Sequence, residues 1–244
     1  MIAVSPEPVD VVAAFTSEYG ITYPVVCDED SSVISTFGIL NTLIDPDEPL
    51  YGLPFPGSYL TDSEGRVTAK FFNRRYQERE APEIVFHDGL HLPVDLSAHP
   101  GATGEAGVSA VLASPRLTFQ QKTAVLVRLD LDAGMHVYGQ PIPDGYVATT
   151  VTVSAPESVV VGEPIYPATK PFAVEGLNEA FHVFEGKVEI EVPLLSSEIE
   201  AETVSLDIQV HYQACDERAC YMPQTVRLAV EAPVGKLNRP PRRG

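Results

Sequence analysis

The sequence is poor in basic residues and in long apolar runs. Its 244 residues include 16 lysines and arginines against 34 aspartates and glutamates, and the net charge of −18 argues against nucleic acid, whose phosphates would repel the chain. No apolar run approaches the roughly 20 residues of a membrane span. The N-terminus also lacks the basic and apolar regions of a signal peptide. The acidic charge fits soluble protein partners better than nucleic acid.

Cysteine is scarce as well. The whole chain has three cysteines, too few to make a disulfide scaffold. Two of them, Cys215 and Cys220, lie in one short segment, 212–223, that also contains two tyrosines. The flanking runs 204–210 and 225–230 alternate apolar and polar residues, as half-buried strands do. The pattern predicts a β-hairpin with the cysteines at its tip, within reach of a disulfide.

Such a pair permits three interpretations. A structural disulfide would stabilise the fold little, because it closes a very short loop. A metal site needs further ligands, and the nearest, His211, lies about 13 Å from Cys215 at roughly 3.3 Å per strand residue. Reversible exchange, in which an exposed thiolate attacks a partner's disulfide, suits a hairpin tip best. We therefore expect neither a metal nor a bound cofactor.

Local charge assigns a role to each cysteine. Asp216 and Glu217 adjoin Cys215 and disfavour its thiolate, whereas Arg218 lies closer to Cys220 and favours the thiolate there. We predict that Cys220 contacts the partner and that Cys215 resolves the mixed disulfide.

The residues from 117 to 230 predict an all-β domain. Short runs rich in valine, isoleucine, threonine and tyrosine alternate with clusters of proline, glycine, aspartate and asparagine, a spacing typical of an antiparallel sandwich. His136 and His182 could be read as catalytic bases, but a lone histidine beside a strand is more often a surface or packing residue. His182 is the better functional candidate of the two.

The cysteine segment resembles a known family. Tyr-Gln-Ala-Cys at 212–215 and Cys-Tyr-Met-Pro-Gln-Thr at 220–225 are similar to the active-site hairpin of the amino-terminal, periplasmic domain of the thiol:disulfide interchange protein DsbD. The segments 134–139, 163–167 and 181–187 match that domain in order and spacing. The resemblance implies an immunoglobulin-like sandwich that lies outside the cytoplasm. It also implies that the domain relays electrons from a membrane-embedded reductase to oxidised thiol proteins.

The same resemblance implies a loop that caps the cysteines with an aromatic side chain. Phe181 and Phe184 are the candidates, and His182 lies between them. Tyr212 and Tyr221, which flank the two cysteines, are further candidates for supporting residues.

The first 90 residues have a different pattern. A helical rhythm covers 8–19, a short strand 22–27 and a second helix 31–37, followed by a hairpin of residues 57–61 and 67–72. This alternation of helices and strands predicts an α/β layer.

Three segments of this part resemble the later half of a thioredoxin-like redoxin of the alkyl-hydroperoxide-reductase and thiol-specific-antioxidant (AhpC/TSA) type. They are residues 20–24, 37–40 and 56–67. The resemblance implies that Pro56 is the cis-proline that borders the active site. The reactive cysteine of that family precedes the segment matched here, so we expect a truncated domain without peroxidase activity. Cys27 ends an apolar strand beside acidic residues, and we expect it to pack as a small hydrophobe.

Together these patterns predict an α+β chain of two domains, a partial thioredoxin-like α/β domain followed by the sandwich. The expected boundaries are a truncated redoxin domain at 1–90, a linker rich in proline and glycine at 91–114, the sandwich at 115–233 and a disordered tail at 234–244.

Two classes of function stay open. The first is a thiol–disulfide relay, of the protein-disulfide reductase type if it is an enzyme, that passes electrons through Cys215 and Cys220 between a membrane reductase or thioredoxin-like donor and an oxidised protein. The second is a non-catalytic binding module with a structural disulfide. A third interpretation, a domain that recycles a peroxiredoxin-like protein, depends on residues outside this sequence.

Overall fold

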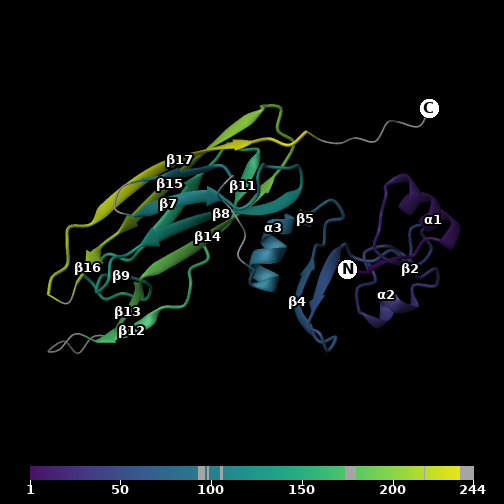
Figure 1. Cartoon of the computed structure of the whole chain (residues 1–244), viewed down its shortest axis with the longest axis horizontal. Coiled ribbons are helices and arrows are strands. Elements are labelled where there is room, and N and C mark those ends of the chain that lie inside the picture. Colours follow the sequence, from purple (N-terminus) through teal and green to yellow (C-terminus); the bar gives the residue numbers. More distant parts are fainter. Residues whose placement is uncertain (93–96, 98, 105–106, 174–179, 217, 237–244) are drawn as a thin grey trace. The chain divides into compact units, whose positions relative to one another are not determined.

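The computed structural model describes residues 1–92, 97, 99–104, 107–173, 180–216 and 218–236 (Figure 1). The chain divides into two compact units. The smaller comprises residues 1–59 and 70–78, and the larger comprises residues 60–69 and the chain from 79 onward.

The smaller unit has the predicted α/β character. Strands β1 (Ala3–Ser5) and β2 (Val25–Cys27) pair in parallel, and helix α1 (Val9–Glu18) connects them. Helix α2 (Ser32–Thr36) follows, and strands β3 (Gly57–Thr61) and β4 (Val67–Phe72) form the predicted hairpin, whose base belongs to this unit. The expected order of helices and strands is therefore confirmed.

Asp28 explains why α2 begins where it does. Its two carboxylate oxygens accept hydrogen bonds from the backbone N–H groups of Val33, at 3.0 Å, and Ile34, at 2.8 Å. These bonds satisfy donors that the first turn of a helix leaves unpaired. Cys27, directly before this aspartate, is a free cysteine that is partly buried at the end of β2.

The assignment of Pro56 as a cis-proline is wrong. Among the described residues the cis peptide bond joins Gln140 to Pro141, and the bond before Pro56 is trans. The carbonyl of Pro56 accepts a hydrogen bond from the backbone N–H of Asn73, at 3.0 Å, beside the base of the β3–β4 hairpin. A short motif around a proline does not select the cis form, because most X-Pro bonds in folded proteins are trans.

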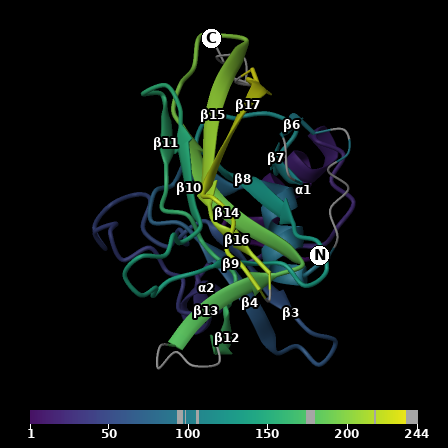
Figure 2. The same cartoon turned by 90° about the vertical axis from the view of Figure 1, so that its left-hand side faces the viewer.

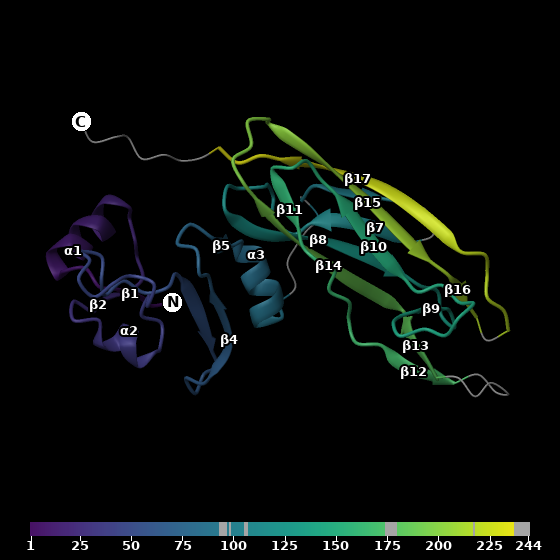
Figure 3. The same ribbon diagram turned by 180° about the vertical axis from the view of Figure 1, so that it is seen from behind.

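The larger unit is an immunoglobulin-like β-sandwich, as predicted. Its largest sheet has the order β11-β14-β8-β7-β6, a second sheet has the order β10-β15-β17, and a third has the order β12-β13-β9-β16. Figure 3 shows the long strands β15 and β17 running across β8 and β14. The strands are β6 (Gly101–Thr103), β7 (Val108–Leu112), β8 (Gln121–Asp130), β9 (His136–Tyr138), β10 (Thr150–Ser154), β11 (Val159–Val161), β12 (Lys170–Ala173), β13 (Ala180–Glu185), β14 (Lys187–Ser196), β15 (Thr203–Tyr212), β16 (Ala214–Cys215) and β17 (Gln224–Pro233).

Alternating apolar side chains build the core of the sandwich. Every second residue of β14 and β15 is buried, as expected of strands that face a core on one side. Residues such as Val127 of β8, Ile190 of β14 and Ile208 of β15 meet in one cluster, which joins the sheet of β8 and β14 to the sheet of β15. This core is what holds the hairpin of β15 and β17 in place.

The sandwich begins earlier in the chain than the sequence indicated. Strand β5 (Arg79–Glu80) pairs in parallel with β8, and α3 (Pro82–Ile84) leads into the π-helical turn η1 (Val85–Gly89). Strands β6 and β7 fall inside the predicted linker and complete the largest sheet. The short apolar run of β7 follows a stretch rich in glycine and alanine, which hid it among loop-like residues.

At the other end, Val234 and Gly235 extend the sandwich. Their backbone N–H groups donate to the carbonyls of Glu202, at 2.8 Å, and Leu117, at 2.7 Å. The rest of the predicted disordered tail, from 237 onward, lies outside the described residues. Across the described part of the chain, none of the helices has the length and apolar character needed to cross a bilayer.

Candidate redox-active site

The hairpin that carries the cysteines is the one the sequence predicted. Strands β15 and β17 pair in antiparallel from Thr203 opposite Pro233 to Tyr212 opposite Gln224. The connection between them includes β16, which pairs with β9 and so joins the third sheet. Figure 2 shows β16, β9, β13 and β12 one after another at this end of the sandwich.

A disulfide joins Cys215 to Cys220. Their Cα atoms lie 4.0 Å apart, and the two residues form an antiparallel bridge. Cys215 is buried, with 2 % of its surface exposed, whereas Cys220 is exposed. Tyr221 and Met222, which follow Cys220, are also exposed, at 49 % and 82 %. Cys220 is therefore the exposed residue of the pair, beside an apolar surface, and Cys215 is the buried one.

Asp216 fixes the loop between the cysteines. Its carboxylate accepts hydrogen bonds from the backbone N–H groups of Arg218, at 2.7 Å, and Ala219, at 2.8 Å, and from the hydroxyl of Tyr221, at 2.8 Å. The two backbone hydrogen bonds lower the pKa of Asp216 most, and the hydrogen bond from Tyr221 lowers it further. The hydrogen bond to Asp216 also raises the pKa of Tyr221. The loop is thus built around an ionised carboxylate and a neutral phenol.

Tyr138 approaches the exposed cysteine from β9. Its hydroxyl lies 3.4 Å from Sγ of Cys220, and the residue is 2 % exposed. Burial, and secondarily the neighbouring Tyr146, raise the pKa of Tyr138, so its hydroxyl keeps its proton at neutral pH. In the sequence this tyrosine belongs to the segment 134–139 that matches the family, and nothing there gives it a role of its own.

Phe181 is the predicted cap residue that the structure brings to the cysteines. It is fully buried in a cluster with Tyr138, Val183 and Cys215, and its ring centroid lies 5.5 Å from that of Tyr138. Phe184 belongs instead to the main core of the sandwich. A capping role for Phe181 stays a prediction, and residues 174–179, just before β13, lie outside the described residues.

The other predicted supporting residues lie in different places. His182 has its Nδ1 3.1 Å from the hydroxyl of Thr169, and its side chain projects to the opposite face of β13 from Phe181 and Val183, which cluster with Cys215. Tyr212 is buried in the main core, and its hydroxyl donates to the side chain of Gln224 at 3.0 Å. Tyr221 contacts the site through Asp216.

His136, judged above to be a packing residue, lies directly opposite Cys215 in the register of β9 and β16. It is 5 % exposed, and its Nε2 has no hydrogen-bond partner among the described residues. Burial lowers the pKa of His136, and the negative charges of Glu185 and Asp216 raise it by less. The imidazole is therefore neutral at neutral pH.

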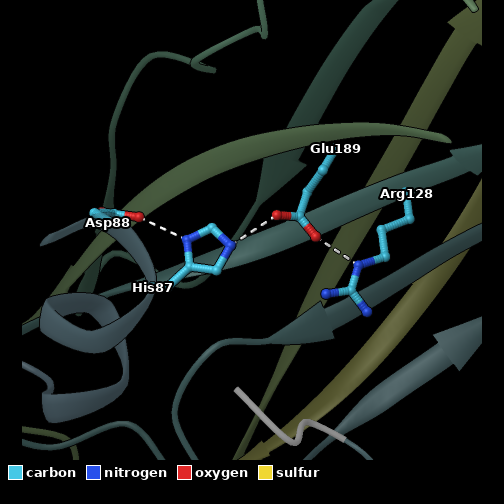
Figure 4. Close-up of polar contacts among 4 residues, drawn as sticks. All are labelled: His87, Asp88, Arg128 and Glu189. Carbon is cyan, nitrogen blue, oxygen red and sulfur yellow. Dashed lines mark hydrogen bonds and ion pairs between the residues drawn. The ribbon is translucent and has the colours of Figure 1, made fainter. Parts of the chain in front are cut away.

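A second polar cluster lies on η1, β14 and β8 (Figure 4). His87 places Nδ1 2.7 Å from the carboxylate of Asp88 and Nε2 2.9 Å from that of Glu189, which also accepts a hydrogen bond from Arg128 at 2.6 Å. Ligand atoms of His87, Asp88 and Glu191 lie within 4.8 Å of one another, as a metal site would need. Both ring nitrogens are occupied by carboxylates, however, so the cluster acts as an ion-pair network that fastens η1 to the sheet.

Several comparisons place these features among known proteins. The N-terminal periplasmic domain of ScsB from Proteus mirabilis is 18 % identical with a TM-score of 0.35, and the match covers 56 % of this chain and 49 % of that one. The chain thus spans about half of that domain. The N-terminal domain of Neisseria meningitidis DsbD in the reduced form is 14 % identical with a TM-score of 0.33, covering 59 % of this chain and 94 % of that one. No curated protein matches the chain.

Two family models match the sequence. Residues 1–70 match the AhpC/TSA family, in agreement with the resemblance of the α/β unit to a redoxin. Residues 109–232, which hold strands β8 to β17 and both cysteines of the disulfide, match the family described as thiol:disulfide interchange protein DsbD, N-terminal. Because this second match covers half of the sequence, the chain belongs to the DsbD N-terminal family.

Proposed function

We propose that this protein relays electrons between protein dithiols by thiol–disulfide exchange at Cys215 and Cys220. The observation that carries the proposal is the unequal burial of the two cysteines in the hairpin of a DsbD N-terminal family domain. A structural disulfide has no need of one accessible sulfur, whereas exchange requires a sulfur that a partner's thiolate can reach.

Reduction of the disulfide follows from this arrangement. A thiolate of the donor attacks Sγ of Cys220, the bond between the two cysteines breaks, and its electron pair leaves on Cys215 as a thiolate that takes a proton. The donor's second thiolate then attacks its own sulfur in the mixed disulfide and releases Cys220. The donor gains a disulfide, and the pair gains two electrons and two protons. The same steps in reverse reduce an acceptor.

Partners and location follow the family. We place the protein outside the cytoplasm, as the ScsB domain is described as periplasmic. A membrane reductase or a thioredoxin-like protein would supply electrons, and an oxidised thiol protein would receive them. The exposed Tyr221 and Met222 offer apolar contact beside the reactive sulfur, and no bound cofactor is needed because the sulfurs carry the electrons themselves.

The AhpC/TSA match at residues 1–70 favours a second, related function. In it, the sandwich would recycle a peroxiredoxin-like partner and would use the same two cysteines. The chemistry is unchanged and only the acceptor differs, so the test below applies to both.

A redox titration tests the proposal. The full chain carrying Cys27→Ser is equilibrated in glutathione or dithiothreitol buffers, and the free thiols are counted by alkylation and mass spectrometry. We expect a reversible two-electron transition in the range of known thiol oxidoreductases, between about −120 and −270 mV. A pair that stays oxidised until the fold is lost would support the binding module with a structural disulfide and end the relay proposal.

A further inference from the structure

Strand β9 places His136 between a thiol and a carboxylate. It lies opposite Cys215 of β16 on one side and opposite Glu185 of β13 on the other. In an antiparallel pair, residues directly opposite each other project to the same face, with Cβ atoms about 4.5 to 5.5 Å apart. The side chains of His136 and Cys215 are therefore direct neighbours.

The alternation of β9 and β16 shows which face this is. Val137 and Ala214, opposite each other in the same register, pack in the main core of the sandwich. Tyr138 and Cys215 belong to the separate cluster around Phe181. His136 shares the face of these residues, so it lies on the side of the sheet that carries the disulfide.

This histidine has an unmet hydrogen-bonding capacity. Its Nε2 is buried and has no partner among the described residues, although buried polar atoms are seldom left unpaired. The ring packs against Phe172, with centroids 4.5 Å apart, and against Tyr138, at 5.5 Å. In the disulfide form Cys215 carries no proton, so it has nothing to donate to this nitrogen. In the dithiol form the same sulfur becomes an S–H donor.

We infer that His136 accepts the proton of the Cys215 thiol when the reduced pair is oxidised. The inference rests on the proposed function and adds a proton acceptor to it. Without such a group, a buried thiol beside the acidic Asp216 would form its attacking thiolate poorly.

Cys220 is joined to the partner's sulfur in the mixed disulfide, and the thiol of Cys215 passes its proton to Nε2 of His136. Sγ of Cys215 attacks Sγ of Cys220, and the bond from Cys220 to the partner breaks with its electron pair on the partner's sulfur. That sulfur leaves as a thiolate, and the imidazolium returns the proton to it or to water.

The charges around His136 suit both of its protonation states. Burial favours the neutral imidazole, which must be free to accept a proton. Glu185, held by Lys170 at 2.8 Å, and Asp216, held by its loop hydrogen bonds, are ionised at neutral pH and stabilise the imidazolium once it forms. Among the described residues, the phenol of Tyr138 and Cys215 itself are the other titratable groups beside the ring.

The test uses Ellman's reagent, which reports the two steps separately. Attack by Cys220 of the reduced protein releases one thionitrobenzoate, and attack by Cys215 on the resulting mixed disulfide releases a second. The proteins are the full chain with Cys27→Ser, alone or with His136→Gln or His136→Phe. His182→Gln is the matched control, since that histidine lies on the adjacent strand β13 between Phe181 and Val183, and its side chain projects to the opposite face from the cysteine cluster.

We expect both His136 variants to slow the second release about 100-fold, near the lower end of general-base effects, and to leave the first unchanged. The second release in the parent should fall off only at acidic pH, as His136 becomes protonated. In His136→Gln it should instead rise about tenfold per pH unit through neutrality, because only free thiolate reacts. The glutamine variant keeps a polar side chain, so it covers the case in which phenylalanine disturbs the fold.

An unchanged second release in both variants would overturn the inference and leave His136 a packing residue. The same conclusion would follow if His182→Gln slowed that release as much as the His136 variants. Failure of the parent protein to release the second thionitrobenzoate at any pH would instead count against the relay itself.

Discussion

The hydroxyl of Tyr138 lies 3.4 Å from Sγ of Cys220 although the two residues are 82 positions apart in the sequence. A neutral phenol can donate a hydrogen bond to a thiolate, and hydrogen bonds to charged groups are worth about 1.5 to 3 kcal/mol. The contact therefore gives the exposed cysteine a donor that favours its thiolate, beyond the effect expected of Arg218.

Tyr138→Phe should accordingly slow the first exchange step. Losing about 1.4 kcal/mol of thiolate stabilisation lowers the thiolate fraction about tenfold, but the more basic thiolate is the better nucleophile, so we expect about a threefold slower attack of Cys220 on Ellman's reagent at neutral pH. Tyr212→Phe, which removes a hydroxyl bound to Gln224 in the main core, should leave that rate unchanged. Equal rates for Tyr138→Phe and the parent would show that the contact has no part in activating the thiol.

The two cysteines should differ when each is replaced in turn. Cys215→Ser leaves the exposed Cys220 free to attack but removes the thiol that resolves the complex, so a mixed disulfide with the partner should accumulate. Cys220→Ser leaves a buried thiol that should trap little. Non-reducing electrophoresis with a thioredoxin-like protein as partner measures both yields. Trapping by Cys220→Ser alone would reverse the roles.

Asp216→Asn should loosen the loop between the cysteines. Because the loop hydrogen bonds lower the pKa of this carboxylate in the folded protein, its contribution to stability is complete above the ordinary value of 3.8. That contribution is lost as the pH falls through the lower folded value. The parent should therefore be the more stable protein at neutral pH and should lose its advantage in acid. Urea unfolding followed by circular dichroism across this range measures the difference, which a flat profile would contradict.

The His87 network has the opposite pH dependence. Burial opposes its charge, but the hydrogen bond to Asp88 and the charge of Glu189 outweigh burial and raise the pKa of His87 above the ordinary 6.5. A raised pKa stabilises the fold below the unfolded value, and the benefit disappears as the pH rises through the folded value. His87→Gln should cost at most about 1 kcal/mol near pH 6, because the pair is partly exposed to solvent, and almost nothing at pH 9.

Amide hydrogen exchange of η1 in both proteins should show the same trend, faster in His87→Gln than in the parent at pH 6 and equal at pH 9 after correction for intrinsic rates. His182→Gln is the control, since that histidine is not part of this network. A difference that grows with pH would contradict the assignment.

Much of the fold could be predicted because it depends on local alternation. The hairpin of β15 and β17 follows from a pattern of apolar and polar residues that repeats every two positions, and so does its cysteine-bearing tip. Strands β5 and β6 carry no such signal, since each is two or three residues long and exists only because β8 and β7 supply partners. Pairing of this kind is a property of the sheet and not of the segment.

The same distinction between local sequence and strand pairing applies to the site. The cysteines are five positions apart in the sequence and could be predicted from it, whereas Tyr138 and His136 reach them only through the pairing of β9 with β16. Nothing near residue 136 indicates a thiol across the sheet. Phe181 and Phe184 also differ only in the folded protein. Both are buried on β13, but Phe181 packs in the cluster of Cys215 and Phe184 packs in the main core.

The unequal exposure of the two cysteines also fixes the order of events in any relay through this site. Because Cys220 is the exposed residue of the pair and Cys215 the buried one, a relay of the proposed kind would take up and pass on electrons through one atom, the sulfur of Cys220. A donor and an acceptor cannot occupy that atom together, so they must take turns. The protein would then work by a ping-pong cycle, in which each partner departs before the next arrives and a surplus of either one slows the other.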